Sequence, residues 1–208
     1  MKYILLFIAL SILSCTSYKN LQEGDLLFQD LDNSALSESI ENATSKKAYF
    51  QISHMGILIK ENNKFYIIEA YDSVQKTPLK QFLNRSKDKF NKPKVIIGRL
   101  KKPYQQYIPK AINNAKNLLG LAYDMQFLLN NNVYYCSELV YDVFLTEDNK
   151  PIFTVKPMSF TNKQTGKIDQ TWIDYFAKQN IAVPEGKLGC NPADYSKLDI
   201  INIIPIKF

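Results

Sequence analysis

Two apolar runs separated by a short polar turn constrain the fold of this chain more than any other feature. Residues 51–60 and 64–70 are rich in isoleucine and aromatic side chains, and the polar residues Asn62 and Asn63 lie between them. This pattern predicts a β-hairpin. If the two asparagines form a two-residue loop, residue 61 faces residue 64 and residue 54 faces residue 71. The fold should therefore contain an antiparallel sheet.

The only histidine of the chain, His54, lies in the first of these strands. Because side chains alternate along a strand, Glu69 in the second strand falls on the same face as His54, diagonally across the pair. Cys136 begins a predicted helix over residues 136–145, and a helix start favours an anion such as a thiolate. A cysteine and a histidine together can attack an acyl carbon, expel an amine or alcohol, and be released by water. The backbone N–H of Cys136 can help to hold the oxyanion.

Purely structural roles for these residues stay open as alternatives. A single buried cysteine or histidine often has only a packing role. If the protein is exported, a disulfide between Cys136 and Cys190 is a rival to catalysis. One histidine and scattered cysteines do not supply the usual ligand spacing of a zinc site, so we expect neither a metal nor another cofactor.

The first residues predict an exported lipoprotein. Lys2 precedes an apolar run over residues 4–13, which has signal-peptide length and is too short to span a bilayer. The run ends at Ser14 and Cys15, where cleavage would make Cys15 the lipidated first residue; an ordinary exported protein is the alternative. The expected division is a signal peptide over residues 1–15, a tether over residues 16–22 and a single domain over residues 23–208, facing the periplasm or the cell exterior.

The net charge of +6 is concentrated in one stretch. Such a stretch could meet anionic lipid or cell-wall polymer, but a solvated lysine-rich loop is the default interpretation. Stacking aromatic residues interleaved with the basic ones and a recognisable nucleic-acid motif are both missing there, and an exported protein rarely meets nucleic acid, so we expect no nucleic-acid partner. The basic residues are Lys80, Arg85, Lys87, Lys89, Lys92, Lys94, Arg99, Lys101 and Lys102.

The remaining patterns predict an α+β fold with an antiparallel sheet packed against helices. Further strands are expected after Gly24 and near residues 74–77, 95–100 and 200–206. A helix over residues 35–43 would be capped by Asn33. Another is expected over residues 104–119, regular only from Pro109, with a buried side made by Ala111, Ala115, Leu118 and Leu119. Beyond residue 147 the pattern is irregular.

Several short segments, taken in order, resemble one enzyme family. They are Gly24-Asp25-Leu26-Leu27-Phe28-Gln29, Ser53-His54-Met55-Gly56-Ile57, Ile68-Glu69-Ala70, Thr77-Pro78-Leu79, Gly120-Leu121-Ala122-Tyr123-Asp124 and Tyr135-Cys136-Ser137-Glu138-Leu139-Val140. Over residues 24–140 this order is similar to the permuted, YiiX-like branch of the NlpC-type papain-fold cysteine hydrolases, in which the histidine precedes the cysteine.

The resemblance implies a circularly permuted papain-like fold with the nucleophile at a helix N-terminus. It implies Cys136, His54 and Glu69 as catalytic residues, Tyr123 near the pocket and Asp124 as a brace of its loop. Substrate-binding roles for Gln29 and Ser137 are expected, with a packing role as the alternative. The implied activity is cleavage of an amide bond in cell-wall peptides or a related acyl substrate. The alternatives are a lipid acyltransferase or esterase of the lecithin:retinol acyltransferase-like type, and a non-catalytic anchored binding module.

Overall fold

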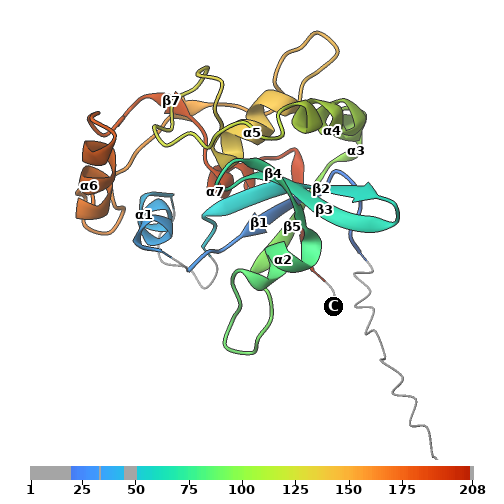
Figure 1. Cartoon of the computed structure of the whole chain (residues 1–208), viewed down its shortest axis with the longest axis horizontal. Coiled ribbons are helices and arrows are strands. Elements are labelled where there is room, and N and C mark those ends of the chain that lie inside the picture. Colours follow the sequence, from blue (N-terminus) through green and yellow to red (C-terminus); the bar gives the residue numbers. More distant parts are fainter. Residues whose placement is uncertain (1–19, 33, 45–50, 207–208) are drawn as a thin grey trace, which may run out of the picture.

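A six-stranded antiparallel sheet forms the centre of the molecule, with helices on both of its faces (Figure 1). The computed structural model describes residues 20–32, 34–44 and 51–206. The predicted signal peptide, the lipidation site Cys15 and the capping residue Asn33 lie outside these residues. Among the helices of the described part, none is long and apolar enough to cross a membrane.

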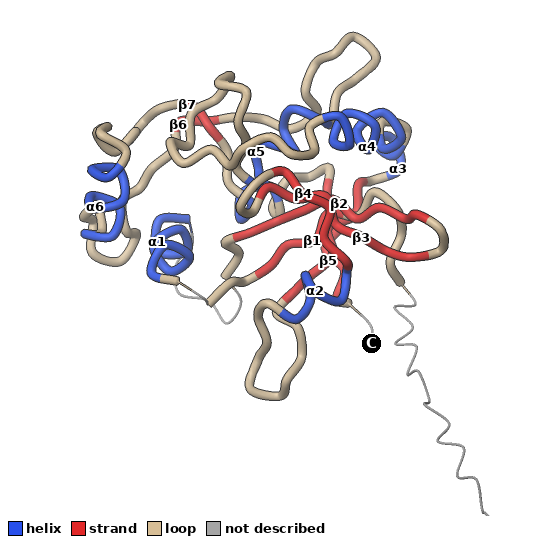
Figure 2. The backbone as a smooth tube through the Cα atoms, in the orientation of Figure 1, coloured by secondary structure: helices blue, strands red, loops and turns tan. Residues whose placement is uncertain are grey.

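The strands follow the order β4-β3-β2-β1-β5-β8 across the sheet, so the last strand of the chain forms one edge of the sheet beside β5. Strands β1 to β5 are labelled in Figure 2. Two further short strands, β6 and β7, pair with each other. The strands are β1 (Leu26–Gln29), β2 (His54–Glu61), β3 (Lys64–Ala70), β4 (Val74–Pro78), β5 (Val95–Leu100), β6 (Lys156–Pro157), β7 (Leu188–Gly189) and β8 (Ile201–Pro205). The helices are α1 (Ala35–Thr44), α2 (Leu79–Asn84), α3 (Lys102–Gln105), α4 (Ile108–Asn117), α5 (Cys136–Val143), α6 (Gln170–Lys178) and α7 (Pro192–Tyr195).

The β2–β3 hairpin has the register that the sequence predicts. Asn62 and Asn63 have φ values of 48° and 59°, and positive φ at both central residues is typical of the turn that matches the twist of a two-residue hairpin. Glu61 pairs with Lys64, and Ile57 pairs with Ile68. A shift of one residue would turn every side chain to the opposite face of the sheet. The turn therefore fixes which face His54 and Glu69 occupy.

Both faces of the sheet are apolar, which explains why the predicted strands are nearly continuous hydrophobic runs. Leu26, Met55 and Ile57 belong to the larger core, which includes Leu139 and Val140 of α5. On the other face Leu27, Leu58 and Ile67 pack with Phe82 of α2. Burying each such side chain contributes roughly 1.5–3 kcal/mol. Helix α5 thus packs against β2 and β3 and carries its first residue to the strand that begins with His54.

The structure departs from the predictions where the elements are short. The helix expected over residues 104–119 is divided into α3 and α4 and ends at Asn117, so Leu119 is 39% exposed instead of buried. Helix α6 lies in the segment whose pattern looked irregular. The sequence does carry a helix signal there: Asp169 precedes the helix, and the large apolar residues Trp172 and Phe176 are four residues apart. Both of these side chains are buried in the structure.

Candidate active site

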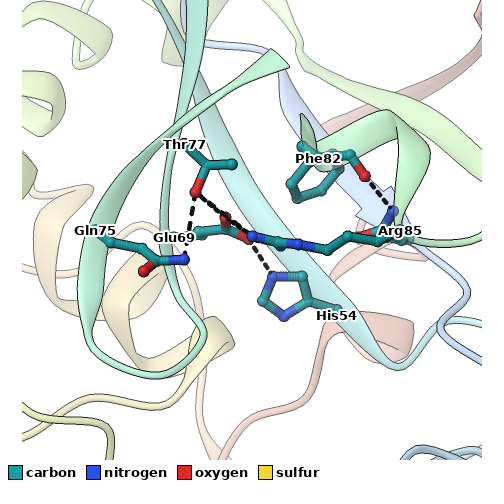
Figure 3. Close-up of polar contacts among 7 residues, drawn as sticks. His54, Glu69, Gln75, Thr77, Phe82 and Arg85 are labelled. Atoms are coloured by element: carbon teal, nitrogen blue, oxygen red, sulfur yellow. Dashed lines mark hydrogen bonds and ion pairs between the residues drawn. The ribbon is translucent and has the colours of Figure 1, made fainter. Parts of the chain in front are cut away.

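The first residue of β2 and a residue near the end of β3 form the centre of the site. His54 Nε2 lies 2.6 Å from Glu69 Oε2, and both side chains are buried (Figure 3). The hairpin register places them on one face at the diagonal distance that the sequence predicts. Glu69 therefore fixes the orientation of the imidazole and leaves its other nitrogen, Nδ1, pointing away from the carboxylate.

Cys136 opens α5 beside this imidazole. Its thiol lies close enough to interact electrostatically with His54, and both residues line one hollow of about 280 Å³. Because Glu69 occupies Nε2, Nδ1 is the ring nitrogen that remains available to exchange a proton with the thiol. The preceding residue, Tyr135, has extended backbone, and its N–H donates to the carboxylate of Glu138, 3.4 Å away, which helps to fix the start of the helix. The sulfur thus lies where a helix leaves its first N–H groups without partners in the helix.

The electrostatics favour a charged histidine. Burial alone lowers the pKa of His54, but hydrogen bonds and charge interactions with Cys136 and Glu69 outweigh burial and raise it to about 9. Burial likewise opposes ionisation of Glu69, yet bonds from His54 and Arg85 lower its pKa to about 2. The imidazolium therefore lies between two partners that carry or can develop negative charge.

Two residues that sequence analysis did not select hold Glu69 in place. Arg85 donates from Nη1 to Oε2 at 2.6 Å and from Nη2 to Oε1 at 2.7 Å, and Thr77 Oγ1 also donates to Oε1 (Figure 3). The guanidinium lies 4.1 Å from the centre of the Tyr71 ring. Glu69 is completely buried, so a two-bond ion pair satisfies a carboxylate that water cannot reach. The site is a chain of four groups in which Cys136 is the first and Arg85 the last.

This finding corrects the interpretation of the basic stretch as a solvated loop. Arg85 is paired with Glu69, Arg99 with the buried Asp25, and Lys94 with Asp30. Lys87, Lys89 and Lys92 are exposed, as that interpretation expects. Sequence position alone could not separate the two groups, because their partners lie on distant segments.

A second cavity, of about 240 Å³, extends from Cys136 away from His54. Tyr123 lines both this cavity and the hollow beside His54, while Ser137 lines only the former and donates to the Cys190 carbonyl at 3.1 Å. Gln29 pairs directly with His54 in the sheet but lines neither cavity, and its Nε2 donates to the Phe82 carbonyl at 2.8 Å. One part of the wall of the second cavity is apolar and includes Ile40, Ala43, Phe127, Tyr135, Met158, Phe160 and Trp172. Another part is polar and includes Lys156, Lys163, Asn191 and Asp194.

The loop that carries Tyr123 is braced by Asp124, whose carboxylate accepts the backbone N–H groups of Gln126 and Leu128. Phe127 in the same loop has a φ of 55°, which is rare for a residue with a bulky side chain. Its ring meets those of Tyr135 and Trp172 at centroid distances of 5.3 and 5.8 Å. The brace thus holds an unfavourable backbone conformation that turns Phe127 into the cavity wall.

Cys136 and Cys190 are both free thiols, so the structure does not contain the disulfide that sequence analysis left open. Both line the second cavity. Burial raises the pKa of the Cys190 thiol to about 11, and its sulfur lies 3.5 Å from the Tyr135 hydroxyl. Cys190 is therefore neutral at physiological pH, and its buried side chain contributes to packing.

Asp30, Asp32 and Glu41 form an acidic group in the described part of the chain. Their carboxylate oxygens lie within 4.8 Å of one another, a spacing that could suit a hard cation. Lys94 Nζ already lies 2.5 Å from both Asp30 and Asp32. An ammonium group thus occupies the position in which a metal ion would bind these two carboxylates.

The raised pKa of His54 has a consequence for stability. Since the value of about 9 lies above 6.5, the ordinary value, the charged imidazole contributes stability fully below pH 6.5 and loses it as the pH rises through 9. We expect the free energy of unfolding of the parent to exceed that of His54→Gln at neutral pH. This excess should shrink by on the order of 3 kcal/mol towards about pH 10. Urea unfolding of both proteins across this range measures the difference, and a constant difference would contradict the assignment.

Comparisons with known proteins agree with this geometry. A family described as "Permuted papain-like amidase enzyme, YaeF/YiiX, C92 family" matches residues 20–195. The uncharacterized protein YiiX of Escherichia coli (strain K12) is 35% identical over 123 residues, which are 59% of this chain and 57% of that protein. The chain thus aligns with somewhat more than half of the length of this relative.

The fold is also found in a solved structure, described as metalloprotein yiiX from Escherichia coli O157:H7. It has a TM-score of 0.69 at 23% identity and covers 90% of this chain and 98% of its own. The YiiX-like resemblance and the permuted papain-like fold are therefore confirmed, while the NlpC-type label fits less closely. Because the family match extends over most of the sequence, the chain belongs to the permuted papain-like amidases of the YaeF and YiiX family.

Proposed function

We propose that this protein hydrolyses an amide bond with Cys136 as nucleophile, His54 as acid and base, and Glu69 as the group that orients His54. The observation that carries the proposal is the position of His54, which is buried, hydrogen-bonded to the Glu69 carboxylate and beside the Cys136 thiol in one hollow. An imidazole that touches only one partner could be a packing residue. One held on both sides has the arrangement that nucleophilic catalysis requires.

The groups account for each step. The Cys136 thiolate attacks the carbonyl carbon, and the N–H groups at the start of α5 offer hydrogen bonds to the oxyanion. As the carbon–nitrogen bond breaks, His54 gives its proton to the leaving amine and the acyl group stays on sulfur as a thioester. Water then attacks the thioester and gives a proton to His54. The acid leaves, and the imidazolium–thiolate pair is restored.

A cell-wall peptide or a related acyl compound is the proposed substrate. The predicted lipoprotein leader supports this choice, because lipidation at Cys15 would hold the domain at a membrane that faces the periplasm or the cell exterior. The second cavity offers room beside the sulfur for the acyl part of the substrate.

The composition of that cavity favours a second candidate, cleavage or transfer of a lipid acyl group. Its aromatic and aliphatic walls lead directly to Cys136. An acyl chain in this cavity would gain about 0.8 kcal/mol for each buried methylene, roughly a four-fold gain in kcat/KM per carbon. Lys156, Lys163, Asn191 and Asp194 also line the cavity and offer partners to the polar atoms of a peptide, so the walls do not exclude the first candidate.

Intact-mass measurement after exposure to cell-wall peptides and, in parallel, to phospholipids separates the candidates. We expect a mass increase equal to the acyl group, on Cys136 and reversed by hydrolysis. It should persist in Cys190→Ala, which removes the other thiol of the cavity, and vanish in Cys136→Ala. If only phospholipid gives an adduct, the substrate is a lipid and the proposal of a peptide substrate is wrong. An acyl adduct on Cys190 would contradict the mechanism.

A further inference from the structure

The segment between α2 and β5, residues 86–94, forms a rigid projection that the active site does not use. We call it the basic loop. The Asp88 carboxylate accepts the N–H groups of Phe90 and Lys92 at 2.8 and 2.9 Å, and the Lys94 N–H donates to the Ser86 carbonyl at 3.0 Å. Asn91 supplies the positive φ that the turn requires. Figure 1 shows the loop extending from the lower side of the molecule, clear of the sheet.

The basic loop presents an aromatic ring among positive charges. Phe90 is 66% exposed, and Lys87, Lys89 and Lys92 are also exposed. Lys89 Nζ lies 5.1 Å from the centre of the Phe90 ring. A ring held in water by a well-bonded turn gains no burial within this chain. Membrane interfaces suit this combination, because lysines meet anionic headgroups while an aromatic ring enters the boundary with the acyl chains.

The loop lies at the same end of the domain as the first described residue. Asn20 Nδ2 donates to the Pro205 carbonyl at 2.8 Å. Pro205 lines a surface hollow of about 530 Å³ together with Lys87 and Lys92 of the basic loop. Asn20 is five positions after Cys15, so an extended link between them reaches at most roughly 17 Å. A lipid on Cys15 would therefore keep this end of the domain close to the bilayer.

We propose that the basic loop docks on an anionic membrane surface, with the Phe90 ring in the headgroup region and the three lysines against lipid phosphates. An anionic wall polymer would use the lysines but would give the exposed ring no apolar environment, so the bilayer is the favoured partner. Each lysine near such a surface contributes about five-fold to the partition coefficient. The inference stands independently of the chemistry at Cys136.

A fluorescent reporter in the full-length chain tests the orientation. The sequence contains one tryptophan, Trp172, which is buried, so Phe90→Trp adds an exposed second one. We expect its emission to shift to the blue, and brominated acyl chains to quench it, on phosphatidylcholine vesicles that contain phosphatidylglycerol. Leu188→Trp is the matched control, because Leu188 is 55% exposed on β7, which lies on the opposite side of the molecule in Figure 1. Any anchor acts equally on both variants, so equal quenching would overturn the proposal.

Charge is tested in the Phe90→Trp background. Replacing Lys87, Lys89 and Lys92 by glutamine should lower binding of the loop about a hundred-fold and remove the blue shift. Replacing the exposed Lys178, Lys187 and Lys197 removes the same charge elsewhere and should leave the shift intact. If vesicles give no shift while soluble polyglutamate binds with the same dependence on the loop lysines, the partner is a polyanion and the membrane proposal fails.

Discussion

Replacing Cys136 by alanine is expected to lower kcat/KM by at least about 10⁴-fold, because the reaction then has no nucleophile and only binding and the oxyanion donors remain. Cys136→Ser should be almost as inactive, since a hydroxyl beside His54 is a far weaker nucleophile than a thiolate. The assay uses the substrate that forms the adduct on the parent protein. The changes are small in volume, so thermal unfolding should remain close to that of the parent.

Cys190→Ala is the matched control for this experiment. Its sulfur lines the same cavity, but its hydrogen bonds are to Tyr135 and its environment keeps it neutral. We expect most of the parent activity in this variant. Full activity of Cys136→Ala would rule out the mechanism, and loss of activity only in Cys190→Ala would move the nucleophile to the other thiol.

Replacing Arg85 by methionine should have the second largest effect. Glu69 would be left fully buried with one positive partner fewer, and breaking a buried pair in this way costs about 3–5 kcal/mol of folding free energy. Loss of the guanidinium also raises the pKa of Glu69 from about 2. Stability from Glu69 is present above its ordinary pKa of 4.5 and is lost as the pH falls through its folded-state pKa, so in Arg85→Met this contribution is smaller and its loss is complete at a higher pH. The pH at which kcat/KM falls on the acid side should also move to a higher value in Arg85→Met.

Arg99 supplies a control of the same kind. Its guanidinium binds the buried Asp25 with two hydrogen bonds, at 2.7 and 2.8 Å, away from the catalytic groups. Arg99→Met should therefore lower the stability without moving the acid limb of kcat/KM. Arg85→Lys keeps the charge but loses the two-bond geometry and should restore part of both properties. Urea unfolding and pH profiles measure the two effects, and an unchanged profile in Arg85→Met would reduce Arg85 to a purely structural residue.

Local patterns predicted the part of the site that local geometry determines. The two asparagines fix the hairpin register, and the register alone brings Glu69 to His54. The apolar face of α5 explains why Cys136 lies over β2. Arg85 escaped prediction because it stands among lysines, and nothing in that stretch shows that its partner is on β3. The cavity walls were missed for a similar reason: Phe160 lies in a loop and Trp172 in the short helix α6, and the positions of both depend on tertiary packing.

The strand order also bears on how the molecule acquires its structure. The hairpin that carries His54 and Glu69 closes over a two-residue loop, which forms quickly and at low cost in chain entropy. The outer edge of the sheet forms only when β8 pairs with β5. The partners Ile204 and Ile97 are separated by about half of the sequence. The acid–base pair can thus be assembled on a nascent polypeptide well before the nucleophile has a substrate cavity beside it. A chain that had not yet folded residues 156–194 would therefore hold His54 beside Glu69 without a large part of the wall of the second cavity.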